Sequence, residues 1–301
     1  LQVALGKLRL ASGHFAGRLL AIDPHRTKSY SKRQMRRHQL KEHSKPVKMA
    51  QSFFLLDADT SQPICFTIGT AARRATQAAA ELLGLAQQIL CLDKATAERP
   101  LVLADEEHYT GEFLALAQER PFDLLVPMKS TRHQQARWQA LAPEGFQRHW
   151  AGYATCKTPY NFGPEEQPCF QFLQRSGERA DQYQFKGYLS SAERSEVEAL
   201  SIEFPKRWHV EEFFKFSQAL GWQRAGTLNL HIRYGQMTMA LLAQAVIHQL
   251  RKRIGPPFDS WDAAHLGKNL FAGLEGDIRV HDDTILVTYY NAPNPELLRA
   301  H

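Results

Sequence analysis

Short runs of apolar residues, separated by polar turns, mark the first 130 residues of the chain. Five of these runs have the length and character of buried strands: residues 18–22, 50–57, 63–69, 101–104 and 123–128. Residues 76–90 and 111–119 instead place their apolar side chains at helical spacing. The second and third runs predict a hairpin, and the helices and strands after it predict a mixed α/β sheet whose parallel strands are covered by helices.

The pattern changes between residues 131 and 200. Aromatic side chains there alternate with polar ones in short runs such as Tyr183-Gln184-Phe185, and turn residues separate the runs. Because alternation with a period of two is typical of strands, this region predicts a β-rich insertion.

Helical spacing returns after the insertion. One helix is predicted over residues 207–220, and a longer one from residue 227 to about residue 253. A basic last turn followed by Gly255-Pro256-Pro257 is a strong signal for the end of the longer helix. In the tail, residues 278–280 and 285–290 predict a second hairpin.

Composition adds limits on the class of protein. The chain has 301 residues, of which 44% are hydrophobic, enough for one large domain with an insertion or for two domains. No run approaches the roughly 18 apolar residues of a membrane span, so we expect none. The four cysteines form no Cys-x-x-Cys pair, which argues against a zinc ribbon or a disulfide framework and agrees with a reducing cytoplasm. Since the first residue is Leu, we expect a further segment upstream.

Positive charge is concentrated in one short arm. Residues 24–48 contain nine Lys or Arg and one acid, Glu42, so the arm carries +8 and the remaining residues −2 of the total of +6. Such a block suits a polyanion such as nucleic acid, although a solvated loop with scattered cations is the ordinary alternative. The position of the arm, directly after Asp23, favours nucleic acid.

Two acids follow predicted strands. Residues 18–22 end at Asp23, where Pro24 and the arm are expected to interrupt regular structure, and residues 101–104 end at Asp105. If the two strands are neighbours in one sheet, both carboxylates emerge at the same edge. Phosphodiester chemistry at a two-metal site needs carboxylates that converge in this way on cations about 3.5–4 Å apart. A turn or helix cap is the alternative for each acid, and Glu106 or Glu107 replaces Asp105 as the candidate if the strand ends one residue later.

The third candidate acid is Glu211. Helical spacing puts Arg207, Glu211, Lys215 and Gln218 on one polar stripe. A solvated helix face with ion pairs between neighbouring turns would show the same pattern.

Together these segments resemble the three acidic motifs of bacterial insertion-sequence transposases of the DDE type. In that group the third motif is similar to Tyr, two residues, Arg, three residues, Glu, six residues, Lys. Phe204, Arg207 and Glu211 keep this spacing, but Phe204 replaces the Tyr and Gln218 replaces the Lys. Lys215, one turn earlier, could supply the missing charge. The resemblance spans roughly residues 18–253.

The resemblance implies a ribonuclease-H-like fold with a β-rich insertion. It implies that Asp23, Asp105 and Glu211 hold Mg²⁺, with Mn²⁺ as a substitute, for DNA strand cleavage and transfer at element ends. Arg207 is then expected to contact a DNA phosphate, and Trp208 to be a core residue. The remaining expected DNA-binding residues are Lys215 and four cations of the arm: Lys32, Arg33, Arg36 and Arg37.

The resemblance also predicts an organisation and a setting. Residues 1–130, with the arm, and 201–255 would form the catalytic domain, residues 131–200 the insertion, and residues 256–301 a tail. The expected partners are double-stranded DNA, as element ends and target, and further copies of the chain in a homodimer or larger assembly. The expected location is the bacterial cytoplasm, at the nucleoid.

Two other functions stay open at this point. One is a DNA-binding remnant without turnover, which the departures at Phe204 and Gln218 favour, and the other is a different ribonuclease-H-like nuclease. Trp150 and Tyr153 could stack on an unpaired base, although a β-domain core explains them better. His25 and His108 lie near the first two acids and are interpreted as solvated or hydrogen-bonded side chains.

Overall fold

The computed structural model describes residues 1–29, 32, 34–39, 45–70, 72–93, 98–163, 167–216, 220–221, 229–256, 258–293 and 295–296. The chain divides into two compact units. The first comprises Leu1–Phe213 and Arg224–Tyr234, and the second comprises Phe214–Gln223 and Gly235–His301.

The helices and strands follow one another in chain order. They are α1 (Gln2–Ala11), β1 (Leu19–Lys28), β2 (Arg37–His38), β3 (Val47–Asp57), β4 (Gln62–Thr70), α2 (Ala75–Ile89), β5 (Leu101–Leu103), α3 (Gly111–Glu119), β6 (Asp123–Pro127), α4 (Arg132–Gln139), β7 (Gln147–Trp150), β8 (Tyr153–Phe162), β9 (Gln167–Ser176), β10 (Gln184–Ser190), α5 (Glu196–Glu198), α6 (His209–Phe216), α7 (Leu230–Ile254), α8 (Ala263–Leu266), β11 (Glu275–His281) and β12 (Thr284–Asn291). Short 3₁₀ or π-helical turns lie between them: η1 (Glu106–His108), η2 (Pro143–Gly145), η3 (Ala180–Gln182), η4 (Ala199–Glu203), η5 (Phe204–Trp208), η7 (Phe258–Ser260) and η8 (Gly267–Phe271).

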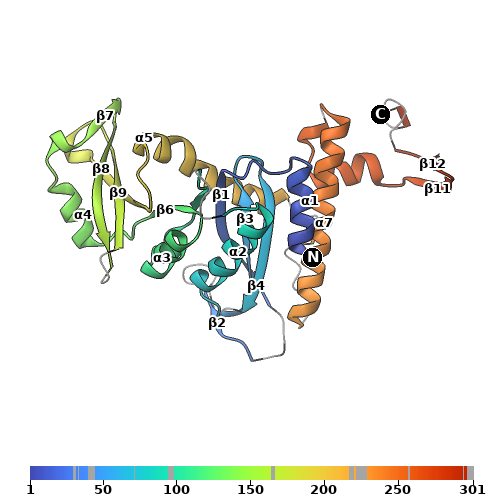
Figure 1. Cartoon of the computed structure of the whole chain (residues 1–301), viewed down its shortest axis with the longest axis horizontal. Coiled ribbons are helices and arrows are strands. Elements are labelled where there is room, and N and C mark those ends of the chain that lie inside the picture. Colours follow the sequence, from blue (N-terminus) through green and yellow to red (C-terminus); the bar gives the residue numbers. More distant parts are fainter. Residues whose placement is uncertain are drawn as a thin grey trace. The chain divides into compact units, whose positions relative to one another are not determined.

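One mixed sheet organises the first unit (Figure 1). Within the described residues its strands lie in the order β2-β3-β1-β5-β6-β10-β9-β8-β7, and β4 also pairs with β3. β1, β5 and β6 are parallel to one another, whereas β3 is antiparallel to both β1 and β4. The predicted mixed sheet flanked by helices is therefore confirmed, including the hairpin of β3 and β4.

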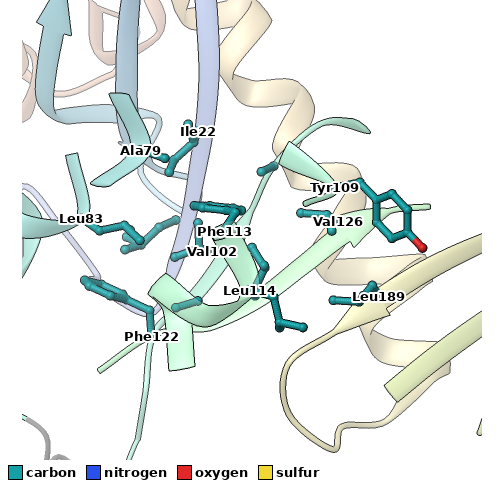
Figure 2. Packing of buried hydrophobic residues seen from close by; sticks show 14 of the residues in the cluster. Ile22, Ala79, Leu83, Val102, Tyr109, Phe113, Leu114, Phe122, Val126 and Leu189 are labelled. Carbon is teal, nitrogen blue, oxygen red and sulfur yellow. The ribbon is translucent and has the colours of Figure 1, made fainter. Parts of the chain in front are cut away.

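The apolar core explains why the helices lie against this sheet. Ile22, Val102 and Val126, from β1, β5 and β6, gather with Phe113 and Leu114 of α3 (Figure 2). The helical spacing of α2 adds a stripe of buried side chains to the same core: Ala78, Ala79, Leu82, Leu83, Ala86 and Ile89. These contacts fix the positions of the parallel strands, and so of the sheet edge near which the first two candidate acids lie.

The opposite face of the sheet is covered by the segments that follow the insertion. Phe54 of β3 packs against Phe213 of α6, with ring centroids 5.5 Å apart, and against Phe66 of β4 at 6.0 Å. The Tyr234 ring of α7 packs against the Phe66 ring, with centroids 5.0 Å apart and the planes tilted by 45°. Because successive side chains of a strand point to opposite faces, Ile22 faces α3 whereas its neighbour Asp23 faces η5 and α6.

The structure corrects the prediction that the strand ends at Asp23. β1 continues through Pro24 to Lys28, paired antiparallel with β3. Its pairing with β5 stops at Ala21, so beyond that residue β1 is an edge on one side. Proline, which cannot donate a backbone hydrogen bond, is tolerated at such an edge. The first residues of the predicted arm, including Arg26 and Lys28, therefore belong to a strand.

The predicted β-rich insertion contains four antiparallel strands, β7 to β10. Its last strand, β10, pairs with β6 through Tyr188, Leu189 and Ser190, so the insertion extends the main sheet. The pattern did not predict helix α4, whose Trp138 is buried. Among the described residues, no helix is both long and apolar enough to cross a membrane.

Candidate active site

The first two candidate acids lie close to where the neighbouring strands β1 and β5 stop pairing, Asp23 within β1 and Asp105 just after β5. Ala21 of β1 is opposite Leu103 of β5 in the parallel register. Asp23 and Asp105 each follow two residues later, so the sheet brings them to the same edge. Burial, followed by the charge of Asp105, raises the pKa of Asp23.

The third acid reaches this edge from the helical segment after the insertion. Arg207 lies in η5 and Glu211 in the first turn of α6, one helical turn later. The Arg207 guanidinium is 3.5 Å from the Asp23 carboxylate and 3.6 Å from that of Glu211. The structure thus gathers Asp23, Asp105, Glu211 and Arg207 around one place, as their positions in the sequence predicted.

Burial makes a charged Asp23 costly. Removal from water, then the negative charge of Asp105, raises its pKa to about 7, with a further contribution from Glu211. The positive charges of Arg207 and Arg26 oppose this rise without cancelling it. A site of this kind holds negative charge that a cation would stabilise.

Asp105 is held differently. His108 is fully buried, and its Nδ1 lies 2.7 Å from Asp105 Oδ1, which also accepts a hydrogen bond from the Glu107 backbone N–H at 3.1 Å. Burial acts to raise the pKa of Asp105, but the hydrogen bond and charge of His108, together with Arg207, outweigh it and lower that pKa. His108 is therefore a buried orienting group for Asp105. A His three residues after a candidate acid was the signal in the sequence.

The donor atoms of this site are of the kind that hard divalent cations prefer. The three carboxylates offer the oxygen ligands that Mg²⁺ or Mn²⁺ prefers. Asp105 and Glu211 lie close enough to Asp23 for their charges to raise its pKa, in addition to the effect of burial. In the part of the chain that the structure describes, no three His, Cys, Asp or Glu side chains are yet arranged to hold one ion together. Arg207 lies between two of the carboxylates. The oxygen atoms of these residues are suitable metal ligands. In the structure, the positive charge beside Asp23 and Glu211 is the Arg207 guanidinium.

A pocket lined by four arginines lies beside β1, β3 and η1. Its volume is about 310 Å³, and its basic lining residues are Arg26, Arg36, Arg73 and Arg74. Arg26 forms an ion pair with Glu107, and its positive charge also acts to lower the pKa of Asp23. Arg74 is 3.4 Å from Glu112. Arg36 brings the predicted arm into this pocket. Glu107 is thereby engaged with Arg26, and Glu106 is exposed, so Asp105 is the better-placed of the three acids.

Sequence reasoning did not find Lys186, which approaches the site from the insertion. Its ammonium lies 5.2 Å from the centre of the Tyr188 ring and 6.0 Å from that of Phe204, the first residue of η5. Its pKa is lowered by burial and by the positive charge of Arg207, against the effect of Glu106. No sequence pattern could have placed Lys186 here, because its position depends on the pairing of β10 with β6.

The other expected DNA-binding residues are spread along the surface. Lys32, Arg36 and Arg37 are exposed, and Arg37 lies in β2. Lys215 is exposed in α6 and belongs to the second unit. Arg33 and Gln218 lie outside the described residues.

Three aromatic or histidine predictions have definite outcomes. Trp208 is 55% exposed, so the expectation of a core residue was wrong: its helical turn directs it away from the sheet. Trp150 and Tyr153 stack on each other with ring centroids 4.2 Å apart, across the β7–β8 turn, but Trp150 is 49% exposed, so the interpretation as core residues does not hold for it. His25 lies in a strand rather than a polar turn, and burial, with the charge of Arg233, lowers its pKa to about 4.

One family of known proteins matches most of the chain. The sequence model of the transposase DDE domain family matches residues 14–246. No curated protein matches the sequence. Among solved structures, the chain is similar to the piggyBac transposase in a synaptic complex with hairpin DNA, studied by cryo-EM, with a TM-score of 0.45 and 10% identity. That match covers 76% of this chain and 46% of the piggyBac chain, so this chain spans less than half of that protein. Because the family model covers most of its length, the chain belongs to the transposase DDE domain family.

Proposed function

We propose that this protein is a DNA transposase that cleaves DNA strands at the ends of an insertion sequence and joins them to a target, with a divalent metal ion. The observation that carries the proposal is the meeting of Asp23 and Asp105, close to where β1 and β5 stop pairing, with Arg207 and Glu211 from the segment after the insertion. The three acids come from three separate segments of the chain, and after burial the charges of Asp105 and Glu211 add to the cost of ionising Asp23.

The residues divide into distinct roles. Asp23, Asp105 and Glu211 would hold Mg²⁺, or Mn²⁺ as a substitute, which would activate the attacking water or 3′ hydroxyl and neutralise charge on the phosphate. His108 is a positioning residue, because it orients Asp105 through its buried hydrogen bond. Arg207 is free to turn from the two carboxylates to a DNA phosphate once a metal neutralises them.

The DNA backbone is proposed to follow the cations around the acidic cluster. These cations include Arg26 and Arg36 of the arginine-lined pocket and Lys186, which lies over the Tyr188 and Phe204 rings. Lys186 would supply the cation that Gln218 lacks in the third motif. Lys32, Arg33, Arg37 and Lys215 are proposed as further phosphate contacts, which position DNA without reading its sequence.

The proposed organisation keeps the divisions expected from the sequence. Residues 1–130 and 201–255 would form the catalytic domain, 131–200 its insertion and 256–301 a tail. The proposed partners are double-stranded element ends and target DNA, together with a second copy of the chain.

A DNA-binding protein without turnover is the second candidate. Two observations favour it: Arg207 lies between Asp23 and Glu211, and no group of three ligands is preformed among the described residues. In this case the cations would bind DNA while the carboxylates pair with Arg207.

Nicking and strand transfer on DNA that carries the element's terminal repeats distinguish the two functions. With Mg²⁺ or Mn²⁺, we expect the unmodified protein to cut and join, and Asp23→Ala and Asp105→Ala to lose both steps while still binding DNA. Glu106→Ala, at the exposed neighbour of Asp105, is the matched control and should retain activity. A protein that binds the ends but never cuts them would support the second candidate.

A further inference from the structure

The hairpin of β11 and β12 has two faces of opposite character. In the register of the two strands, Ile278 is opposite Val287, Val280 is opposite Ile285, and Gly276 is opposite Tyr289. Since paired residues share a face and neighbours in a strand alternate, these residues form one face of the hairpin. We call its five side chains the apolar face: Ile278, Val280, Ile285, Val287 and Tyr289.

The other face of the hairpin is polar. Asp277 accepts a hydrogen bond from the Tyr290 hydroxyl and lies 3.8 Å from Arg279. His281, Thr284 and Thr288 lie on the same side by the same alternation. Leu286 is the one aliphatic residue among them. The sequence of the hairpin is thus patterned for a sheet that buries one face.

The apolar face is nevertheless open to solvent in a single chain. Its five side chains are between 43% and 72% exposed. Within the described residues the two strands form a sheet by themselves, and an isolated two-stranded hairpin is at best marginally stable in water. Continuous apolar patches of a few hundred Å² mark interaction surfaces.

We propose that the apolar face is a self-association surface, on which the same face of a second copy of this chain packs. A two-fold axis brings a face onto its own copy, so one patch is complementary to itself. Three or four β-branched side chains from each copy would interdigitate as the inner faces of two packed sheets do.

The charge and the area of the apolar face both favour a second copy of the chain as its partner. The apolar face has no charged side chain, and the charges elsewhere on the hairpin are mostly acidic: Glu275, Asp277, Asp282 and Asp283 against Arg279. A nucleic acid would therefore be repelled. Five side chains exposed to this degree present on the order of 500 Å² per copy, so a pair of faces buries about 1,000 Å², the lower limit for a specific interface.

Adjacent residues of β12 provide a matched test. Ile285 lies on the apolar face and is 66% exposed, whereas Leu286 lies on the polar face and is 56% exposed. We expect sedimentation velocity of the full chain without DNA, from about 1 to 100 µM, to show a mass that rises above 34.3 kDa toward that of a dimer. Ile285→Asp should raise the dissociation constant at least about tenfold, because association would bury a carboxylate, and Leu286→Asp should change it less than about twofold.

Val287→Thr guards against loss of folding. It keeps the β-branched shape and adds only a hydroxyl, so we expect weaker association with an unchanged circular dichroism spectrum. An unmodified protein that stays monomeric over the whole range would overturn the proposal, as would equal losses for Ile285→Asp and Leu286→Asp. These results do not depend on DNA cleavage, so the proposed activity could fail while the self-association stands, or the reverse.

Discussion

At the scale of single residues, Asp23 shows how the proposed catalytic arrangement would oppose stability. It is largely removed from water at an edge shared with Asp105 and Glu211, and this partial burial together with these charges raises its pKa to about 7. The same carboxylate in an unfolded chain ionises near pH 4. Folding therefore favours the protonated form of Asp23, and the proposed metal site would stabilise the charged form.

The sign of this effect gives a prediction for Asp23→Asn. Because the pKa of Asp23 is raised in the folded state, its contribution destabilises the fold increasingly from about pH 4 to pH 7 and fully above that. In EDTA at pH 8 we expect Asp23→Asn to increase the free energy of unfolding by roughly 2–4 kcal/mol, and by less at pH 5. Urea unfolding at both pH values measures this. A variant less stable than the unmodified protein at pH 8 would show that Asp23 has a structural role.

His108 makes a separate prediction about metal affinity. His108→Phe keeps a ring beside Phe113, whose centroid is 5.1 Å away, but removes the hydrogen bond to Asp105. We expect the affinity for Mn²⁺, measured by calorimetry, to fall by about tenfold or more. His133→Phe, at an exposed position of α4, is the control and should bind Mn²⁺ normally. If His108→Phe bound Mn²⁺ with unchanged affinity, His108 would not position Asp105 for metal binding.

At the scale of elements, the insertion depends on a close approach between β10 and α4. A Cβ at Gly187 would lie 2.5 Å from the Trp138 ring, which is buried and cannot move aside freely. We expect Gly187→Ala to reduce the free energy of unfolding by about 1–3 kcal/mol. Gly145→Ala, where a Cβ meets no atom within 4 Å, should change it much less. Thermal unfolding of both variants measures this. Equal stabilities for Gly187→Ala and Gly145→Ala would show that β10 can accept a side chain at residue 187.

Most elements could be predicted from the sequence because their patterns are local. Helical spacing predicted α2 and α3 almost to the residue, and apolar or β-branched runs separated by turn residues predicted the hairpins β3–β4 and β11–β12. The continuation of β1 past Pro24 could not be predicted, because it depends on where β5 stops pairing with β1. Helix α4 has few apolar residues besides Trp138, so its spacing gave little signal.

The candidate site divides in the same way. Asp23, Asp105 and Glu211 follow recognisable strands or spacing. Arg207 as a bridge between two carboxylates, the arginine-lined pocket and Lys186 arise from strand order and tertiary packing.

At the scale of the whole molecule, the excess of positive charge predicts how DNA binding responds to salt. Arg36 lines the arginine pocket, whereas its neighbour Arg37 is exposed in β2 outside it. We expect Arg36→Ala to reduce the slope of log affinity against log salt by about one, since one phosphate contact is lost. Arg37→Ala should have a smaller effect. Equal slopes for Arg36→Ala and the unmodified protein would exclude the pocket from the DNA path.

The central claim is that three carboxylates form a metal-dependent site for DNA cleavage, and adjacent residues of α6 test it most directly. Glu211 faces Arg207 and the acidic cluster, whereas Glu212 is exposed. The measurement is the rate of Mn²⁺-dependent nicking of DNA that carries the element's ends. The account predicts that Glu211→Gln abolishes nicking and that Glu212→Gln leaves it unchanged. Nicking that survives in Glu211→Gln would contradict the account.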